Sequence, residues 1–168
     1  MLELCIVGAK NSGKTTLIEE LVHRLSTNGY KVATIKHTAH SHAFDTPGKD
    51  SFRHRAAGAK ATIVKSNQEF AFFASPETEI NNGIEILFHK YFDVCLIEGD
   101  VYSDKRKIVI SRNYENLKVQ PPKNVIAIYG PECALNKTIR FELNDVEGLY
   151  ALIVKLMNEG KKEIHHEG

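Results

Sequence analysis

Cysteine is scarce in this chain, and the cysteines that are present are too far apart to act as a pair. Cys5, Cys95 and Cys133 are isolated and odd in number, and no C-x-x-C sequence occurs. This pattern argues against a disulfide framework and against a thiolate metal site. Because Cys5 and Cys95 lie inside apolar runs, we expect buried free thiols, as in a cytoplasmic protein.

Long apolar runs and an excess of one charge are also missing. No stretch is long enough to span a membrane, and the first residues are typical of a strand rather than of a signal peptide. The formal net charge of +1 argues against nucleic-acid binding by bulk electrostatics. Residues 31–65 nevertheless carry seven Lys or Arg against two Asp. This basic segment is either a solvated face or a surface that binds an anion.

What the sequence does contain is a phosphate loop. Residues 8–15 read GAKNSGKT and match the pattern G-x-x-x-x-G-K-[ST]. An apolar run at 4–7 precedes the loop and an amphipathic helix follows it, so the elements occur in the required order. We expect Gly8 and Gly13 to adopt positive φ angles and to let phosphate oxygens approach the backbone. The pattern predicts a nucleoside triphosphate with Mg²⁺, bound by loop amides and the helix N-terminus.

Individual residues of this site have predicted roles. Lys14 is expected to reach the β- and γ-phosphates, and the Thr15 hydroxyl is expected to ligate Mg²⁺. Glu98 ends the apolar strand at 94–97, where ligands of parallel sheets bind, so we expect it near Mg²⁺ or an attacking water. With Lys14 it forms the predicted catalytic pair. The predicted nucleotide-binding residues are Gly8, Ala9, Lys10, Asn11, Ser12, Gly13, Lys14, Thr15 and Thr16.

Two acidic residues and three histidines follow the second predicted strand. Asp45 and Asp50 could contact the same metal ion, or they could favour the first turn of the next helix. His37, His40 and His42 form an H-x-x-H-x-H pattern that could ligate zinc or nickel. Because no cysteine joins them, the pattern favours contact with phosphate or another anion over a metal site.

The remaining patterns predict an α/β fold. Strands are expected at 31–35, 94–97, 108–110 and 125–128, helices at 49–57, 76–91 and 145–157, and a hairpin from 61–64 and 70–73. The expected architecture is a three-layer P-loop NTPase fold with a mostly parallel sheet and an antiparallel hairpin extension. The hairpin also offers an edge for a dimer. We expect a single nucleotide-binding domain over residues 1–158 and a polar C-terminal tail over 159–168.

Four segments together resemble the molybdopterin-guanine dinucleotide biosynthesis protein B (MobB) family. They are residues 8–15, Ile35-Lys36-His37, residues 45–54 with Ala57-Gly58-Ala59, and Leu96-Ile97-Glu98-Gly99. The resemblance covers about residues 2–112. It implies a homodimeric GTP-binding accessory protein of molybdenum cofactor biosynthesis with weak Mg²⁺-dependent GTP hydrolysis. The implied partners are MobA, which attaches GMP to molybdopterin, and molybdopterin itself or its molybdenum-loaded form.

The chain departs from the family pattern in places. Asp100-Val101 follow Glu98-Gly99, where the family usually has an aromatic residue and a lysine, although Lys105-Arg106-Lys107 could supply comparable positive charge. The guanine-reading N-K-x-D motif is absent, because Asn136-Lys137-Thr138-Ile139 ends in isoleucine. No acidic residue follows the strand at 125–128 either. The expectation of GTP rather than ATP therefore depends on the resemblance alone.

Two alternative functions remain at this point. An ATP-dependent P-loop small-molecule kinase would need an arginine over the phosphates, and Arg53 or Arg55 could supply it. A binding module would instead hold a phosphorylated pterin in the basic segment, with little turnover of its own. For either an anion or a protein partner, the predicted contacts are Lys36, His37, Lys49 and Arg53.

Overall fold

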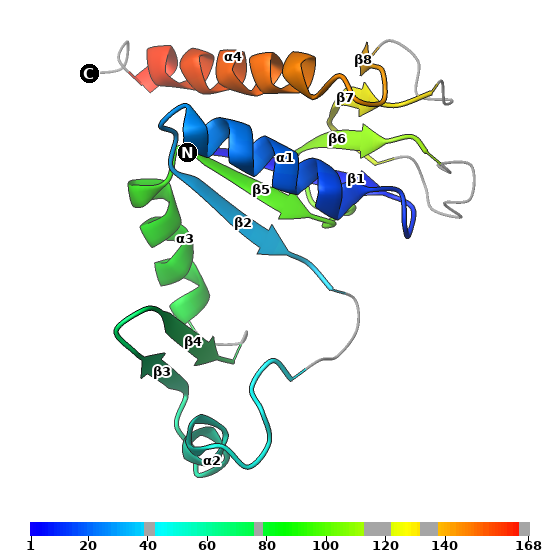
Figure 1. Cartoon of the computed structure of the whole chain (residues 1–168). Coiled ribbons are helices and arrows are strands. Elements are labelled where there is room, and N and C mark those ends of the chain that lie inside the picture. Colours follow the sequence, from blue (N-terminus) through cyan, green and yellow to red (C-terminus); the bar gives the residue numbers. More distant parts are fainter. Residues whose placement is uncertain (39–42, 76–78, 113–121, 132–137, 165–168) are drawn as a thin grey trace. The chain divides into compact units, whose positions relative to one another are not determined.

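The computed structural model describes residues 1–38, 43–75, 79–112, 122–131 and 138–164 of the chain. The chain divides into two compact units, one formed by Met1–Thr38 with Phe88–Gly168 and the other by Ala39–Leu87 (Figure 1). Within the described residues, no helix has both the length and the apolar character needed to cross a bilayer. His40, His42, Cys133 and the Asn136-Lys137 pair lie outside the described residues.

The first unit is built on a six-stranded sheet with the order β2-β5-β1-β6-β7-β8. Every pair of neighbouring strands in this sheet is parallel, which confirms the predicted parallel α/β architecture. The strands are β1 (Leu2–Gly8), β2 (Val32–Lys36), β5 (Val94–Glu98), β6 (Arg106–Ile110), β7 (Val125–Tyr129) and β8 (Ile139–Phe141). The short edge strand β8 was not among the predicted strands.

Two helices pack on one face of this sheet. In α1 (Lys14–Thr27) the buried positions are 17, 18, 21 and 25, which form one stripe of a 3.6-residue period. In α4 (Val146–Ile164) Leu149, Ile153 and Met157 form the corresponding stripe. Both stripes pack against β-strand residues such as Leu4, Ile6 and Ile108 in one core cluster. The helix α4 continues past residue 158, where the polar tail was expected to begin.

The opposite face of the sheet has a smaller core. Cys5, Val7, Cys95, Ile97 and Val109 are buried there, and partly buried side chains that include Phe88, Phe92 and Val101 pack against them. Both cysteines are free thiols, as predicted. Burial raises the pKa of both thiols, and that of Cys95 reaches about 11, with the nearby carboxylate of Glu3 adding to the effect. Neither thiol is therefore suited to nucleophilic chemistry.

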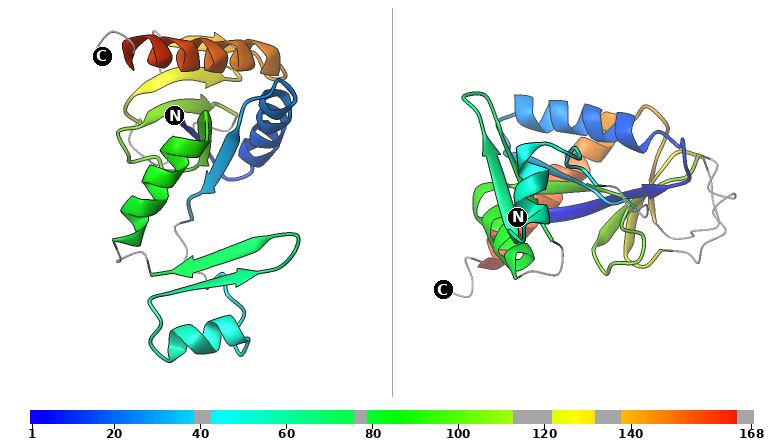
Figure 2. Two further views of the ribbon diagram at one scale, coloured as in Figure 1. Left: turned by 90° about the vertical axis from the view of Figure 1, so that its left-hand side faces the viewer. Right: turned by 90° about the horizontal axis from the view of Figure 1, so that it is seen from below.

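The second unit contains one short helix and a hairpin. The helix α2 (Asp50–Ala56) runs beside the antiparallel pair β3 (Ala61–Lys65) and β4 (Phe70–Ala74) (Figure 2). These strands pair with one another as a separate two-stranded sheet. The hairpin is therefore confirmed, but it does not extend the parallel sheet as the sequence predicted. Helix α3 (Ile80–Tyr91) starts in this unit and ends in the first.

Candidate functional site

The phosphate-loop sequence forms the connection between β1 and α1. Gly13 has φ 96° and Asn11 has φ 61°, so two loop residues adopt the left-handed region. The expected positive φ is confirmed at Gly13 and is wrong at Gly8. Gly8 is needed for a different reason, because a Cβ atom there would lie 2.8 Å from Ser12 Oγ and 3.0 Å from the Ile110 carbonyl oxygen.

Lys14, the first residue of α1, has its ammonium group folded back over the loop. Its Nζ donates hydrogen bonds to the carbonyl oxygens of Ala9 at 2.7 Å and Gly8 at 3.2 Å. Burial lowers the pKa of Lys14; the carboxylate of Glu98 opposes this shift, and the charge of Lys36 adds to it. A lysine held over the loop by two carbonyl oxygens can exchange them for phosphate oxygens without a large change in position.

Three side chains meet beyond the carboxyl ends of the strands. The Thr15 hydroxyl donates to Glu98 Oε2 at 3.1 Å, and Lys36 Nζ lies 3.5 Å from Glu98 Oε1. The strands bring them together, because β5 lies between β2 and β1 with Lys36 and Ile6 opposite Glu98. The Glu98 side chain is only 16% exposed. Hydroxyl and carboxylate oxygens at this spacing are ligands of the kind that Mg²⁺ prefers.

The backbone fixes the position of Glu98 at the end of β5. The His37 amide donates to the Glu98 carbonyl oxygen at 2.9 Å, and the Gly99 amide donates to the Ile6 carbonyl oxygen at 3.0 Å. Gly99 has φ 94°, so the turn after Glu98 requires glycine at this position. Glu98 thus offers a carboxylate of the kind that binds a metal ion, and the turn at Gly99 fixes the backbone that carries it.

The other loop residues differ in exposure. Lys10 and Thr16 are exposed, whereas Ala9 and Ser12 are buried. The Ser12 hydroxyl oxygen is a buried polar atom without a hydrogen-bond partner among the described residues. A buried polar group of this kind is unfavourable unless it is satisfied, so the loop keeps an unused donor next to Gly8.

The predicted residues Asp45, Lys49, Asp50 and Arg53 all lie in the second unit. Asp45 is 4% exposed and accepts hydrogen bonds from Ser51 Oγ at 2.8 Å and from Arg55 Nη2 at 2.9 Å. Burial raises the pKa of Asp45, but its hydrogen bonds with Ser51 and Arg55 and the charge of Arg55 outweigh this, so the net pKa is lowered. Asp50 is exposed and lies 3.6 Å from Arg53. Both aspartates thus have a local role in starting and anchoring α2.

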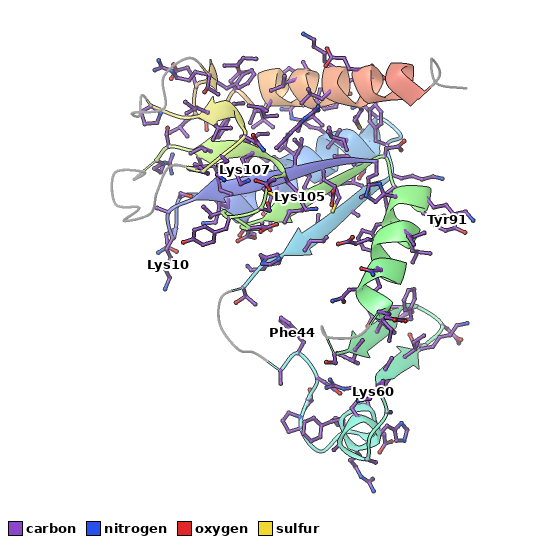
Figure 3. All side chains as sticks on the ribbon, turned by 180° about the vertical axis from the view of Figure 1, so that it is seen from behind. Lys10, Phe44, Lys60, Tyr91, Lys105 and Lys107 are labelled. Atoms are coloured by element: carbon purple, nitrogen blue, oxygen red, sulfur yellow. The ribbon has the colours of Figure 1, made fainter. Side chains whose placement is uncertain are left out.

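The second unit also has an open cavity of about 910 Å³. Its lining includes the aromatic rings of Phe44, Phe72 and Phe73 and the cationic side chains of Arg55 and Lys60. The Arg55 guanidinium carbon lies 5.4 Å from the centre of the Phe73 ring, and Phe44 is 78% exposed. Figure 3 labels Phe44 and Lys60 in this unit. The cavity therefore offers both π-faces and positive charge.

Sequence patterns did not identify every residue of these sites. The contact between Lys36 and Glu98 depends on the pairing of β2 with β5, and strand order is not visible in the sequence. The cavity was also missed, since its walls come from separate segments. Among the described residues, no cluster of three or more His, Cys, Asp and Glu could hold a metal ion.

Comparison with known proteins identifies similar sequences. The family model for molybdopterin guanine dinucleotide synthesis protein B (MobB) matches residues 3–130. The molybdopterin-guanine dinucleotide biosynthesis adapter protein of Escherichia coli (strain K12) is 32% identical over 164 residues, which cover 93% of each chain. A probable adapter protein of the same description from Bacillus subtilis (strain 168) is 35% identical over 127 residues, or 73% of this chain and 72% of that one.

Solved structures have the same fold. The crystal structure of Bacillus subtilis MobB matches with a TM-score of 0.74 and 28% identity, over 92% of this chain and 97% of that chain. A MobB homologue from Bacillus stearothermophilus matches with a TM-score of 0.66 over 95% of this chain and 99% of that chain. At 22% identity, this second match bears on the fold alone.

Proposed function

The chain belongs to the MobB family of molybdopterin guanine dinucleotide synthesis proteins, and we propose that it serves this synthesis as a GTP-binding adapter. The observation that carries the proposal is the convergence of Lys14, Thr15, Glu98 and Lys36 at the carboxyl ends of β1, β2 and β5. Parallel sheets bind phosphorylated ligands at this edge. The adapter would assist a MobA-type guanylyltransferase that attaches GMP to molybdopterin.

Phosphate binding would depend on the loop and on Lys14. The amides of the loop and of the first turn of α1 would bind the phosphates. Lys14 Nζ would leave the carbonyl oxygens of Gly8 and Ala9 and bind the β- and γ-phosphate oxygens. Burial has removed water from the Lys14 ammonium group, and the phosphate oxygens would give this group negatively charged partners. This stabilises the protonated lysine and favours the bound state.

Thr15 and Glu98 fit a Mg²⁺ site, because they offer hard oxygen ligands 3.1 Å apart. The bound ion would supply positive charge to the β- and γ-phosphate oxygens. Glu98 could also accept a hydrogen bond from an attacking water and orient it, while Lys36 Nζ holds the other carboxylate oxygen. Asp45 and Asp50 remain predicted contacts for the ion. Their hydrogen bonds and ion pairs within the second unit favour the structural alternative.

Hydrolysis is expected to be slow. Phosphoryl transfer needs positive charge on the transferred group, and the cations that contact the loop carbonyl groups and Glu98 are two lysines, Lys14 and Lys36. Many P-loop proteins complete such a site with an arginine from a partner. A homodimer or the guanylyltransferase would be the natural source of that charge here. The exposed hairpin β3–β4 is our proposed dimer edge.

The kinase alternative is weakened by the contacts of Arg55. Its guanidinium group binds Asp45 and lies over Phe73, so two of its interaction surfaces are already used. Arg53 is 71% exposed and pairs only loosely with Asp50 at 3.6 Å. It remains the candidate for this role. Under this alternative, ATP and an acceptor molecule would give a phosphorylated product.

The cavity of the second unit supports an additional binding role. A phosphorylated pterin is a planar heterocycle with negative charge, and the cavity offers aromatic rings together with Lys60. We place molybdopterin there in preference to Lys36 and His37, which belong to the other unit. Lys49 and Arg53 lie in the same unit as the cavity, but they do not form part of its wall.

Calorimetric titration with GTP, ATP, GDP and ADP in the presence of Mg²⁺ tests the main proposal. Wild-type protein should bind guanine nucleotides more tightly than adenine nucleotides, and Lys14→Ala should lose triphosphate binding. Lys65→Ala, which removes an exposed lysine from β3, is the matched control and should bind normally. Normal GTP binding by Lys14→Ala would disprove the phosphate-loop assignment, and formation of a phosphorylated acceptor from ATP would favour the kinase.

Binding of a pterin monophosphate, followed by its fluorescence, tests the second role. The double variant Phe44→Ala, Lys60→Ala should lose this binding, whereas Lys14→Ala and Lys65→Ala should keep it. If the double variant bound the pterin as wild type does, the cavity would not be the site.

A further inference from the structure

Lys107 is a lysine within β6 whose side chain is completely buried. It lies opposite Cys5 in the pairing of β1 with β6 and shares the face of Val109. Burying an ammonium group is unfavourable unless hydrogen bonds replace its water shell. Here Nζ donates to two backbone carbonyl oxygens, that of Lys105 at 2.9 Å and that of Ser103. Lys107 therefore cannot supply surface charge, contrary to the expectation from the Lys105-Arg106-Lys107 sequence.

Both acceptors belong to the loop that follows the candidate metal ligand Glu98. The loop spans residues 99–105, and its residues 101, 103 and 105 are more buried than residues 102 and 104. Val101 packs against the core on this face of the sheet, so the loop is in contact with the sheet. Lys105 and Lys107 are labelled at this position in Figure 3.

Side chains hold four of the loop carbonyl groups. Ser103 Oγ donates to the Asp100 carbonyl oxygen at 3.2 Å, and Asn124 Nδ2 donates to that of Asp104 at 2.6 Å. Lys107 holds the other two, and its carbonyl acceptors lie on either side of Asp104. Lys107 is the one fully buried donor of this set. Without its ammonium group, two carbonyl oxygens would lose their donor together.

The start of the loop is coupled directly to Glu98. Gly99 and Asp100 both have positive φ angles, 94° and 58°, so the turn between strand and loop has little freedom to adjust. The Gly99 amide is hydrogen-bonded to Ile6 in β1. A shift of residues 100–105 would therefore be transmitted to the end of β5, where the Glu98 carboxylate meets Thr15 and Lys36.

We infer that Lys107 is a positioning residue, which fixes the loop 99–105 and through it the Glu98 carboxylate. Its side chain is fully buried and does not itself form part of the candidate site. Its role is to keep the carboxylate in place before ligand binds, so that the site needs little rearrangement. The catalytic part of this inference rests on the proposed function of Glu98, whereas the anchoring of the loop stands independently of it.

The test compares Lys107→Met with Lys105→Met. Methionine keeps most of the volume of the buried stem and removes the ammonium donor. Lys105→Met removes a lysine side chain that pairs with Glu3 at 3.0 Å, and it keeps the carbonyl group that accepts from Lys107. Amide hydrogen exchange of residues 99–106 should become about tenfold faster in Lys107→Met and less than about threefold faster in Lys105→Met, which loses one partly exposed ion pair but no carbonyl anchor.

Two further measurements separate positioning from general stability. Cys5 Sγ lies 3.8 Å from Ser103 Oγ, so a reagent should reach Cys5 more easily in Lys107→Met. Loss of the Lys107 charge raises the pKa of this thiol and slows alkylation, so a net acceleration reports opening of the loop. Exchange in α1 and α4 should stay as in wild type. Single-turnover GTP hydrolysis should fall about tenfold with no change in nucleotide affinity, as expected when only the carboxylate is misplaced. Lys107→Gln keeps one donor group and should be intermediate. It also replaces Lys107→Met if that variant does not fold.

Loop exchange and Cys5 alkylation equal to wild type in both Lys107 variants would overturn the inference. Faster loop exchange with unchanged hydrolysis would overturn its catalytic part. If wild-type protein neither bound nor hydrolysed GTP, the proposed function would fail, while the exchange data would still decide whether Lys107 anchors the loop.

Discussion

Apolar burial holds the first unit together, whereas the most buried side chain described in the second unit is a carboxylate. Every buried hydrophobic side chain of the described residues belongs to the first unit. In the second unit only Asp45 is buried among residues 43–75 and 79–87. That unit also exposes several large apolar side chains, namely Phe44, Ile63, Val64, Phe70, Ile86 and Leu87.

This difference separates two ways of fixing a conformation. A parallel sheet with α1 and α4 on one face, and the end of α3 and a loop on the other, has enough apolar contact to define the geometry of the loop between β1 and α1. A two-stranded hairpin is only marginally stable in water. Specific polar contacts such as those of Asp45 must therefore contribute a larger share of the stability of the second unit. The comparison predicts that the same kind of substitution will have different consequences in the two units.

Truncation of an apolar side chain should show the largest difference between the two units. Leu21 in α1 is fully buried, and Leu21→Ala should lower the free energy of unfolding by about 3 kcal/mol, because it leaves a cavity. Ile63 in β3 is 63% exposed, and Ile63→Ala should change the same quantity by less than about 0.5 kcal/mol. Denaturant unfolding measures both. Equal losses would show that the hairpin is covered in solution and would remove the contrast between the units.

The two partly or fully buried carboxylates give the second comparison. Glu98→Gln should keep nucleotide affinity and lower GTP hydrolysis by about a hundredfold, since the amide is a poor base and a poor metal ligand. Asp45→Asn should leave hydrolysis close to wild type if Asp45 anchors α2, as its contacts with Ser51 and Arg55 indicate. Single-turnover hydrolysis at saturating Mg²⁺ distinguishes them. A hundredfold loss in Asp45→Asn would instead support its predicted role at the metal.

Asp45→Asn should act on the second unit itself. The lowered pKa of Asp45 means that its carboxylate stabilises the fold at pH values above the usual 3.8 of aspartate. That contribution is lost as the pH falls through the lower pKa of the folded state. At neutral pH the variant should therefore be cleaved about tenfold faster between residues 43 and 75 by a protease. Asp50→Asn is the comparison variant: at its exposed position it loses only a favourable charge in the first turn of α2, so its cleavage should be less than about twofold faster than that of wild type.

The contrast between the units also explains what the sequence could predict. Strand β1 and helix α1 are neighbours in the sequence and follow clear periodicities, so both elements were predicted correctly. The three-residue strand β8 has too short an apolar pattern, and it is recognised only through its pairing with β7. The hairpin was found from its two apolar runs and its turn. Whether it joins the main sheet depends on long-range pairing that its own sequence does not contain.

The candidate site divides in the same way. Lys14 and Thr15 follow from the loop pattern, because the motif fixes both residue type and position. The contact of Glu98 with Lys36 needs the neighbouring positions of β2 and β5. Lys107 was misread as a surface charge, since a basic triplet is normally exposed. A lysine directly before the apolar run 108–110 was the signal that could have suggested its burial.

The smallest expected effect concerns the pH dependence of nucleotide binding in the first unit. Burial lowers the pKa of Lys14 in the free protein below its usual 10.5, and bound phosphates would raise it again. The affinity for GDP should therefore be highest at pH values below the lowered pKa, where Lys14 is protonated. It should fall as the pH rises through this pKa, by less than tenfold per pH unit. Calorimetry with GDP between neutral pH and pH 10 would measure this decline.

Substitution of two neighbours of Lys14 should shift the pH at which GDP affinity is lost, in opposite directions. The charge of Lys36 lowers the pKa of Lys14, so Lys36→Ala should shift the loss of affinity to higher pH. The carboxylate of Glu98 raises that pKa, so Glu98→Gln should shift the loss to lower pH. Deprotonation of the guanine base of GDP affects wild type and both variants equally, so it cancels in the comparison. Shifts in the same direction would show that the ion pair between Lys36 and Glu98, rather than Lys14, controls the titration of the site.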